Sequence, residues 1–208
     1  MTLNYSARSR AIEPFHVMAL LQRANELQAA GHDVIHLEIG EPDFTTAEPI
    51  IQAGQAALAS GQTRYTAARG LPALREAIAG YYASHYGLNI NPERIMITPG
   101  GSGALLLASA LLVDPGQHWL LADPGYPCNR HFLRLVEGAA QLVPVGPQAN
   151  YQLNADLVAQ YWNQNSVGAL VASPANPTGT VLSRDELSAL SAALRERGGH
   201  LVVDEIYH

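Results

Sequence analysis

The most informative absence in this chain of 208 residues is lysine, because all 12 basic side chains are arginines. Cysteine is nearly absent too: Cys128 stands alone, can form no internal disulfide, and is interpreted as a small, partly buried thiol. The N-terminal segment lacks the basic and apolar regions of a signal peptide, and no run approaches the roughly 18 apolar residues of a membrane span. We therefore expect a cytoplasmic protein without membrane contact.

Positive charge is scarce as well. The formal net charge is −6 at pH 7, and the arginines are scattered along the chain. A surface that binds a nucleic acid backbone needs basic residues clustered on one face, so nucleic acid is excluded as an expected partner. With 48% hydrophobic and 14% charged residues, the composition is typical of a globular protein with a sizeable core.

Two helices are indicated by the spacing of apolar residues and by signals at their ends. Apolar residues recur every three or four positions over residues 72–86, with Pro72 placed for the first turn and Gly87 just past the end. Ser183 and Glu186 have the spacing of a capping box, which predicts a helix that begins after Ser183.

Short strand-like runs alternate with the helical segments. They cover residues 94–98, 118–122, 140–144, 167–172 and 200–204. Repeated strand–helix–strand units imply right-handed crossovers. The sequence therefore predicts an α/β fold with a mostly parallel sheet and helices on both of its faces.

Polar and glycine-rich motifs follow four of these runs. They are Gly100-Gly101-Ser102-Gly103, Asp123-Pro124-Gly125-Tyr126, the segment from Ser173 to Gly179, and the segment from Asp204 to Tyr207. In an open parallel sheet, ligands bind at the carboxyl ends of the strands. We therefore expect the functional site at this edge.

The glycine-rich motif lies between the run 94–98 and a helical run over residues 104–112. Free backbone amides, the Ser102 hydroxyl and the positive end of a helix would suit a phosphate. The motif has no lysine of a Walker loop, and Leu106 stands where the dinucleotide fingerprint has its third glycine. A tight turn between strand and helix also needs glycines, so both interpretations stay open.

Asp204 ends an apolar strand-like run, where a buried carboxylate is costly unless a cation or hydrogen bonds compensate it. Tyr207 could add a phenol to the same cleft, and Asn176 could add an amide. Taken singly, Asp204 could be a helix cap, Tyr207 a core residue and Asn176 a turn residue. Their joint position at one sheet edge, with Tyr126, favours a functional site.

Several motifs together resemble the ordered signature of class I/II aminotransferases, the pyridoxal-phosphate enzymes of the aspartate aminotransferase fold. They are the segment from Leu37 to Phe44, Tyr65-Thr66 with Gly70, Leu74-Arg75, the segments from Thr98 to Gly101 and from Asp123 to Pro127, and those from Ser173 to Gly179 and from Asp204 to Tyr207. The resemblance covers almost the whole chain.

The resemblance implies how pyridoxal 5′-phosphate would be held. Asp204 would pair with the protonated pyridine nitrogen and keep the ring an electron sink. Asn176 and Tyr207 would hydrogen-bond the phenolic oxygen of the ring, and Tyr126 would stack on its face.

The remaining implied contacts involve the phosphate, the substrate and a second subunit. Amides near Gly101 and the Ser102 hydroxyl would bind the phosphate, and Gly40 would lie near the substrate carboxylate. Tyr65 would reach the phosphate of the partner subunit, so the resemblance implies a homodimer with shared active sites. Packing within one chain is the alternative for Tyr65. No metal site is implied.

One departure from the family pattern is the missing lysine, which in the family forms a Schiff base with the cofactor and moves a proton. The resemblance therefore implies the N-terminal part of an enzyme that is inactive alone. Residues 1–44 would be an N-terminal arm and the first part of a small domain, and residues 45–208 a large cofactor-binding domain truncated at its C-terminal side.

The expected reaction of the whole enzyme moves an amino group between an amino acid and a 2-oxo acid by a ping-pong route. A carbon–sulfur lyase of the same fold, or a non-catalytic aminotransferase-like regulatory or ligand-binding domain, would carry similar motifs. The sequence does not identify the amino acid, because a few pocket contacts decide specificity.

Overall fold

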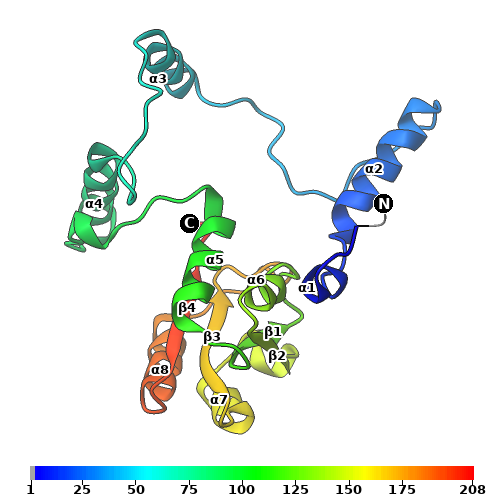
Figure 1. Ribbon diagram of the computed structural model, residues 1–208, viewed down its shortest axis with the longest axis vertical. Helices are drawn as coiled ribbons and strands as arrows, with labels where there is room; N and C mark the ends of the chain where they lie inside the picture. Colours follow the sequence, from blue (N-terminus) through cyan, green and yellow to red (C-terminus); the bar gives the residue numbers. More distant parts are fainter. Residues whose placement is uncertain (1–2) are drawn as a thin grey trace. The chain divides into compact units, whose positions relative to one another are not determined.

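The computed structural model describes residues 3–208, which divide into two compact units. The first unit contains residues 3–13 and 99–208 and is called the sheet unit here; the second contains residues 14–98. The elements of both units are labelled in Figure 1. A domain boundary after residue 44 stays a prediction, because it concerns the architecture of a larger protein.

Four parallel strands form the sheet of the sheet unit. They are β1 (His118–Asp123), β2 (Ala139–Pro144), β3 (Ser166–Ala172) and β4 (His200–Asp204), in the spatial order β2-β1-β3-β4. In the register, Leu120 pairs with Gln141 on one side and with Ala169 on the other, and Ala172 pairs with Asp204. The predicted parallel sheet is confirmed, and all four strand ends face one edge.

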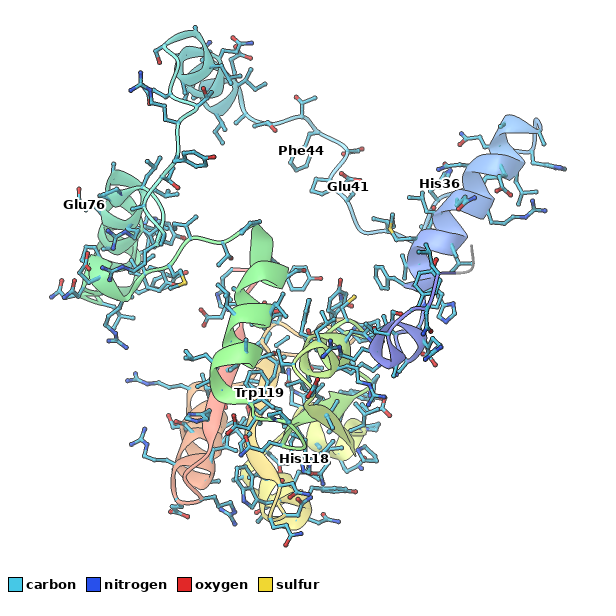
Figure 2. The ribbon with its side chains drawn as sticks, viewed as in Figure 1. His36, Glu41, Phe44, Glu76, His118 and Trp119 are labelled. Carbon is cyan, nitrogen blue, oxygen red and sulfur yellow. The ribbon has the colours of Figure 1, made fainter. Side chains whose placement is uncertain are left out.

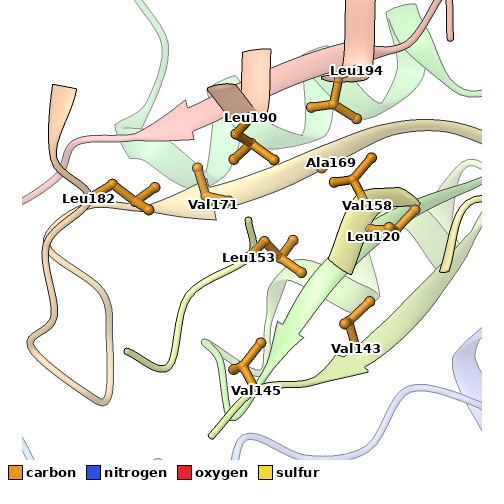
Figure 3. Close-up of a cluster of buried hydrophobic side chains, with 10 residues drawn as sticks. All are labelled: Leu120, Val143, Val145, Leu153, Val158, Ala169, Val171, Leu182, Leu190 and Leu194. Atoms are coloured by element: carbon orange, nitrogen blue, oxygen red, sulfur yellow. The ribbon is translucent and has the colours of Figure 1, made fainter. Parts of the chain in front are cut away.

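Two helices pack on one face of the sheet, α7 (Ala155–Tyr161) and α8 (Arg184–Arg195). Side chains from both helices enter a cluster of buried residues with β1, β2 and β3, as Figure 3 shows. Leu190 of α8 and Val158 of α7 are fully buried in it, as is Leu120 of β1. Such burial contributes about 1.5–3 kcal/mol for each large aliphatic side chain.

Two further helices cover the opposite face, α5 (Gly100–Leu112) and α6 (Asn129–Leu135). The second buried cluster contains Leu133 of α6 together with Trp119 and Leu121 of β1. Trp119 of β1, labelled in Figure 2, is only 1% exposed. Because Leu120 and Leu121 alternate between the two clusters, β1 is apolar on both faces, as expected of a strand inside an α/β sheet.

Local signals explain where α8 begins. Ser183 Oγ accepts a hydrogen bond from the Glu186 amide, and the Glu186 carboxylate accepts one from the Ser183 amide at 2.8 Å. Hydrogen bonds from the Ser183 hydroxyl, at 2.7 Å, and from its amide hold the pKa of the Glu186 carboxylate below its ordinary value. The predicted capping box is confirmed, and it fixes the position at which the chain turns back after β3.

The remaining elements are α1 (Ala7–Arg10) and the 3-10 turn η2 (Pro147–Ala149) in the sheet unit, and α2 (His16–Ala29), α3 (Glu48–Ala59), α4 (Pro72–Tyr86) and the 3-10 turn η1 (Pro92–Arg94) in the second unit.

The helix predicted over residues 72–86 is confirmed. Pro72 lies in its first turn, and Gly87 ends it with φ +67°, a conformation that favours glycine. Arg75 of α4 is buried and donates to Pro92 O and Glu93 Oε1, both at 3.0 Å.

Two local expectations are wrong. Residues 94–98 form no strand: Arg94 ends η1, and within residues 3–208 no strand pairs with the segment that follows. Ile97 N donates instead to Arg69 O at 3.1 Å, and a single bond of this kind does not make a ladder. The glycine-rich motif is not a loop before the helix, because α5 already begins at Gly100.

Candidate functional site

The carboxyl edge of the sheet collects the segments that follow β1, β3 and β4, because all strands run in the same direction. The N-terminus of α5 belongs to the same edge. Residues 113–117 connect the end of α5 to the start of β1, so the helix runs antiparallel to the strand and begins beside the strand's carboxyl end. The sheet edge predicted from sequence is therefore assembled within one unit.

Asn176 and Tyr207 are in direct contact at this edge. Asn176 Nδ2 donates to Tyr207 Oη at 3.2 Å, although the two residues lie 31 positions apart. Tyr207 is 58% exposed, which excludes the alternative of a core tyrosine within the described chain. An amide and a phenol that share a hydrogen bond can be directed at the same ligand atom.

Asp204 ends β4 half-buried, and its Oδ1 accepts a hydrogen bond from Ile206 N at 3.1 Å. The carboxylate is only partly buried because β4 is an edge strand of the sheet. The local bond is the kind that aspartate makes in turns, and it orients the carboxylate at the mouth of the site.

Tyr126 lies three residues after the end of β1, and its pKa responds to Tyr207 and Asp204. A hydrogen bond to Cys128 raises the pKa of Tyr126 to about 12, and partial burial and electrostatic interaction with Cys128, Tyr207 and Asp204 add to this shift. The phenol is therefore neutral at physiological pH. Tyr126 and Asn176 both line one cavity at this edge of the sheet.

The segment that carries Asn176 is tied to the end of β4. Ser173 is buried, donates its amide to Asp204 O at 3.1 Å and accepts from Leu182 N at 3.0 Å through its hydroxyl. His208 Nε2 lies 3.0 Å from Ser173 O. These bonds hold Asn176 and Asp204 in a fixed mutual position.

A cavity of about 220 Å³ lies beside these side chains. Its lining includes Tyr126 and Asn129 from the segment after β1, Gln152, and Asn176. Within the described residues, Asn129 Oδ1 is buried without a hydrogen-bond partner. The cavity therefore presents polar groups from three separate segments.

The N-terminus of α5 presents an anion site in outline. Gly101 and Ser102 lie exposed in its first turn, and Pro99, at the N-cap position, has no side chain that could cap the helix. The first amides of a helix have no acceptor within the helix, and they carry its positive dipole end. A phosphate would satisfy them, as predicted for this motif.

Gly40 and Tyr65 belong to the second unit, whereas the other predicted site residues belong to the sheet unit. Both are exposed, and Tyr65 is fully accessible to solvent. Their roles stay predictions.

Two residues of this site were missed by sequence reasoning. Cys128 is the partly buried thiol that the sequence predicted, but its hydrogen bond with the phenol of Tyr126 was not foreseen. Gln152, 3% exposed, lines the cavity and belongs to no motif. The Tyr126–Cys128 spacing of two residues in a tight turn was a usable signal, but no local signal marked Gln152.

Comparison with known proteins now decides the family. The family model described as aminotransferase class I and II matches residues 32–208, most of the chain. The chain belongs to the class I and II aminotransferases. The resemblance in sequence motifs and the fold predicted from it are thereby confirmed.

Curated aminotransferases match over nearly the whole chain. A valine–pyruvate aminotransferase of Mycobacterium tuberculosis is 38% identical over 197 residues, which cover 95% of this chain and 50% of that protein. A probable aspartate/prephenate aminotransferase of Thermus aquaticus is 34% identical, covering 97% of this chain and 53% of that protein. The chain thus spans about half the length of the curated relatives it matches.

Solved aminotransferase structures give the same result. An aminotransferase from Mycobacterium tuberculosis superposes with a TM-score of 0.94 at 37% identity, covering 100% of this chain and 53% of that one. An aspartate aminotransferase from Thermus thermophilus with maleate gives a TM-score of 0.93 at 33% identity, covering 99% of this chain and 54% of that one.

Among the described residues, no helix is long and apolar enough to cross a membrane.

Proposed function

We propose that the complete protein containing this chain is a pyridoxal-phosphate-dependent aminotransferase that moves an amino group between an amino acid and a 2-oxo acid. The observation that carries the proposal is the convergence of four side chains at one sheet edge. Asp204 and Tyr207 act on the titration of Tyr126, and Asn176 donates to Tyr207. A carboxylate, two phenols and an amide beside an open helix N-terminus match the polar atoms of this cofactor.

Each group has a separate task in the proposal. Asp204 would hold a proton on the pyridine nitrogen, because an anionic carboxylate stabilises the cationic ring. Asn176 and Tyr207 would bind the phenolic oxygen, and Tyr126 would cover the ring face while remaining neutral. When bound, the cofactor supplies an electron sink for the substrate Cα.

The phosphate would bind at the N-terminus of α5, where Gly101 and Ser102 are exposed. Ser102 would add a hydroxyl donor to the backbone amides, and the helix dipole would favour the negative charge. Gly40, by family resemblance, would lie near the substrate carboxylate. Tyr65 would reach the phosphate in the partner subunit, so we propose a homodimer whose active sites contain residues of both subunits.

The 208 residues contain no lysine, so no side-chain amine is present to bind the cofactor aldehyde. We propose that this amine lies in residues beyond the present sequence and that the chain alone does not turn over. The cytoplasmic location stays a prediction.

The substrate pair to test first follows from the Mycobacterium tuberculosis relative at 38% identity, which is named for valine and pyruvate. The complete protein, loaded with pyridoxal phosphate, is incubated with valine and pyruvate and then with a panel of other amino acids and 2-oxo acids. We expect stoichiometric conversion of one amino acid into its 2-oxo acid while the acceptor becomes its amino acid. Release of ammonia without a new amino acid would contradict amino transfer and favour a lyase.

A further inference from the structure

Gln152 is a buried polar side chain in the segment between η2 and α7. Its carboxamide nitrogen, Nε2, donates to Ala172 O at 3.0 Å and to Thr180 O at 3.1 Å, and it lies 3.3 Å from Thr180 Oγ1. Both backbone acceptors are far away in the sequence. A single side chain therefore joins three segments of the sheet unit.

The two acceptors, Ala172 O and Thr180 O, flank the segment 173–179 that carries Asn176. Ala172 is the last residue of β3, and Thr180 is the residue at which the segment returns. Within the segment, Ala175 N donates to Thr180 O at 2.9 Å, and Gly179 N donates to Ala175 O at 2.7 Å. Gln152 thus closes the base of a loop whose tip presents Asn176.

The chemistry of this position requires a donor with two N–H groups. Removing this donor costs free energy at Ala172 O, whereas Thr180 O keeps the amide of Ala175 as a second donor. An ionised glutamate of the same shape has acceptor oxygens but no donor, and a methionine of similar length has no N–H group. A shorter asparagine keeps the amide but lacks one methylene group of reach.

We propose that Gln152 is a positioning residue that fixes the 173–179 loop and thereby aims Asn176 at the phenolic oxygen of the cofactor. The part of this inference that concerns the cofactor rests on the proposed function. The part that concerns the loop rests only on the contacts of Gln152. The two parts are tested by separate measurements.

The loop is tested by hydrogen exchange of this chain. In Gln152→Met and Gln152→Asn, the amides of Ala175 and Gly179 should exchange about tenfold faster or more, because no side chain then links Ala172 O to Thr180 O across the base of the loop. The amides of α8 should exchange as before, and the exposed control Gln164→Ala should change nothing. Unchanged loop exchange would overturn the proposal. A rise shared by α8 in both variants would also overturn it, since Gln152 would then support the whole unit.

The link to Asn176 is tested in the complete protein by the pH midpoint of the bound cofactor's absorbance. Removing the Asn176 donor should raise this pH midpoint. Without that hydrogen bond the phenolic oxygen keeps more electron density and holds the neighbouring titrating proton of the bound cofactor more tightly. Gln152→Met should raise it in the same direction, and adding Gln152→Met to Asn176→Ala should cause no further shift. Additive shifts, or no shift in Gln152→Met, would refute positioning through Asn176. If the protein bound no cofactor, the proposed function would fail while the hydrogen-exchange result would still decide the role of the loop contact.

Discussion

The proton on Tyr126 gives a test of the site's geometry that needs no cofactor. The hydrogen bond to Cys128 is the largest cause that raises its pKa to about 12, two units above the ordinary value of about 10. At a pH of about 11, an ordinary tyrosine is about 90% ionised, whereas Tyr126 should be only about 10% ionised. Cys128→Ala removes the largest cause and should move the pKa back toward 10.

The assay is a pH titration of phenolate absorbance in the ultraviolet. Because the chain contains nine tyrosines, the curve of Tyr126→Phe is subtracted from that of the wild-type chain to isolate Tyr126. The same subtraction in the Cys128→Ala background gives the shifted midpoint. Cys128→Ser, which keeps a hydrogen-bonding group, serves as the control and should fall between the two.

The direction of the linked stability change follows from the raised pKa. The folded chain holds this proton more tightly than the unfolded chain, so the stabilisation is fully present below a pH of about 10 and is lost as the pH rises through about 12. A wild-type midpoint near 10, or a midpoint that Cys128→Ala leaves unchanged, would refute the placement of these two side chains.

Three further predictions concern the cofactor, assembly and stability. Borohydride treatment of this chain with pyridoxal phosphate should leave no adduct on a side chain, because the sequence has no lysine, and an adduct found by mass spectrometry would contradict this. In the complete protein, Tyr65→Phe should weaken cofactor retention by about 1.5–3 kcal/mol, measured by equilibrium dialysis, and leave the dimer intact. In heterodimers of this variant with a subunit that lacks the cofactor-binding lysine, one wild-type site should be restored. If the Tyr65 defect instead stays with the lysine of its own subunit, Tyr65 acts within one chain. Leu190→Ala should lower the free energy of unfolding by about 2–5 kcal/mol in a denaturant titration, since Leu190 is fully buried, while a loss below about 1 kcal/mol would question the core.

Much of the fold could be predicted because its signals are local. Pro72 and Gly87 bracket α4 as expected, and Ser183 with Glu186 starts α8. The segment 94–98 misled the prediction because its apolar residues resemble a strand, whereas strand formation depends on a neighbour elsewhere in the chain. The local sequence pattern and the observed strand pairing agree for β1 to β4 and disagree for residues 94–98.

The sheet topology allowed the location of the candidate site to be predicted, but not the contacts within it. Parallel strands bring their carboxyl ends together, so Asn176, Asp204 and Tyr207 could be grouped in advance. Their contacts could not, because a bond such as Asn176–Tyr207 depends on loop conformation. The role of Gln152 could not be predicted from the sequence at all, because it depends on acceptors that only the folded structure brings next to this side chain.

The most direct test of the account is the protonation of the cofactor's pyridine nitrogen, measured by ¹⁵N NMR in the complete protein loaded with labelled pyridoxal phosphate. If Asp204 faces this nitrogen, the wild-type resonance should be that of a protonated ring throughout the neutral pH range. In Asp204→Ala the resonance should move to that of the neutral ring, and the single-turnover rate with an amino acid should fall by several orders of magnitude. A ring that stays protonated in Asp204→Ala, or that is unprotonated in the wild type, would contradict the assignment of this sheet edge as the cofactor site.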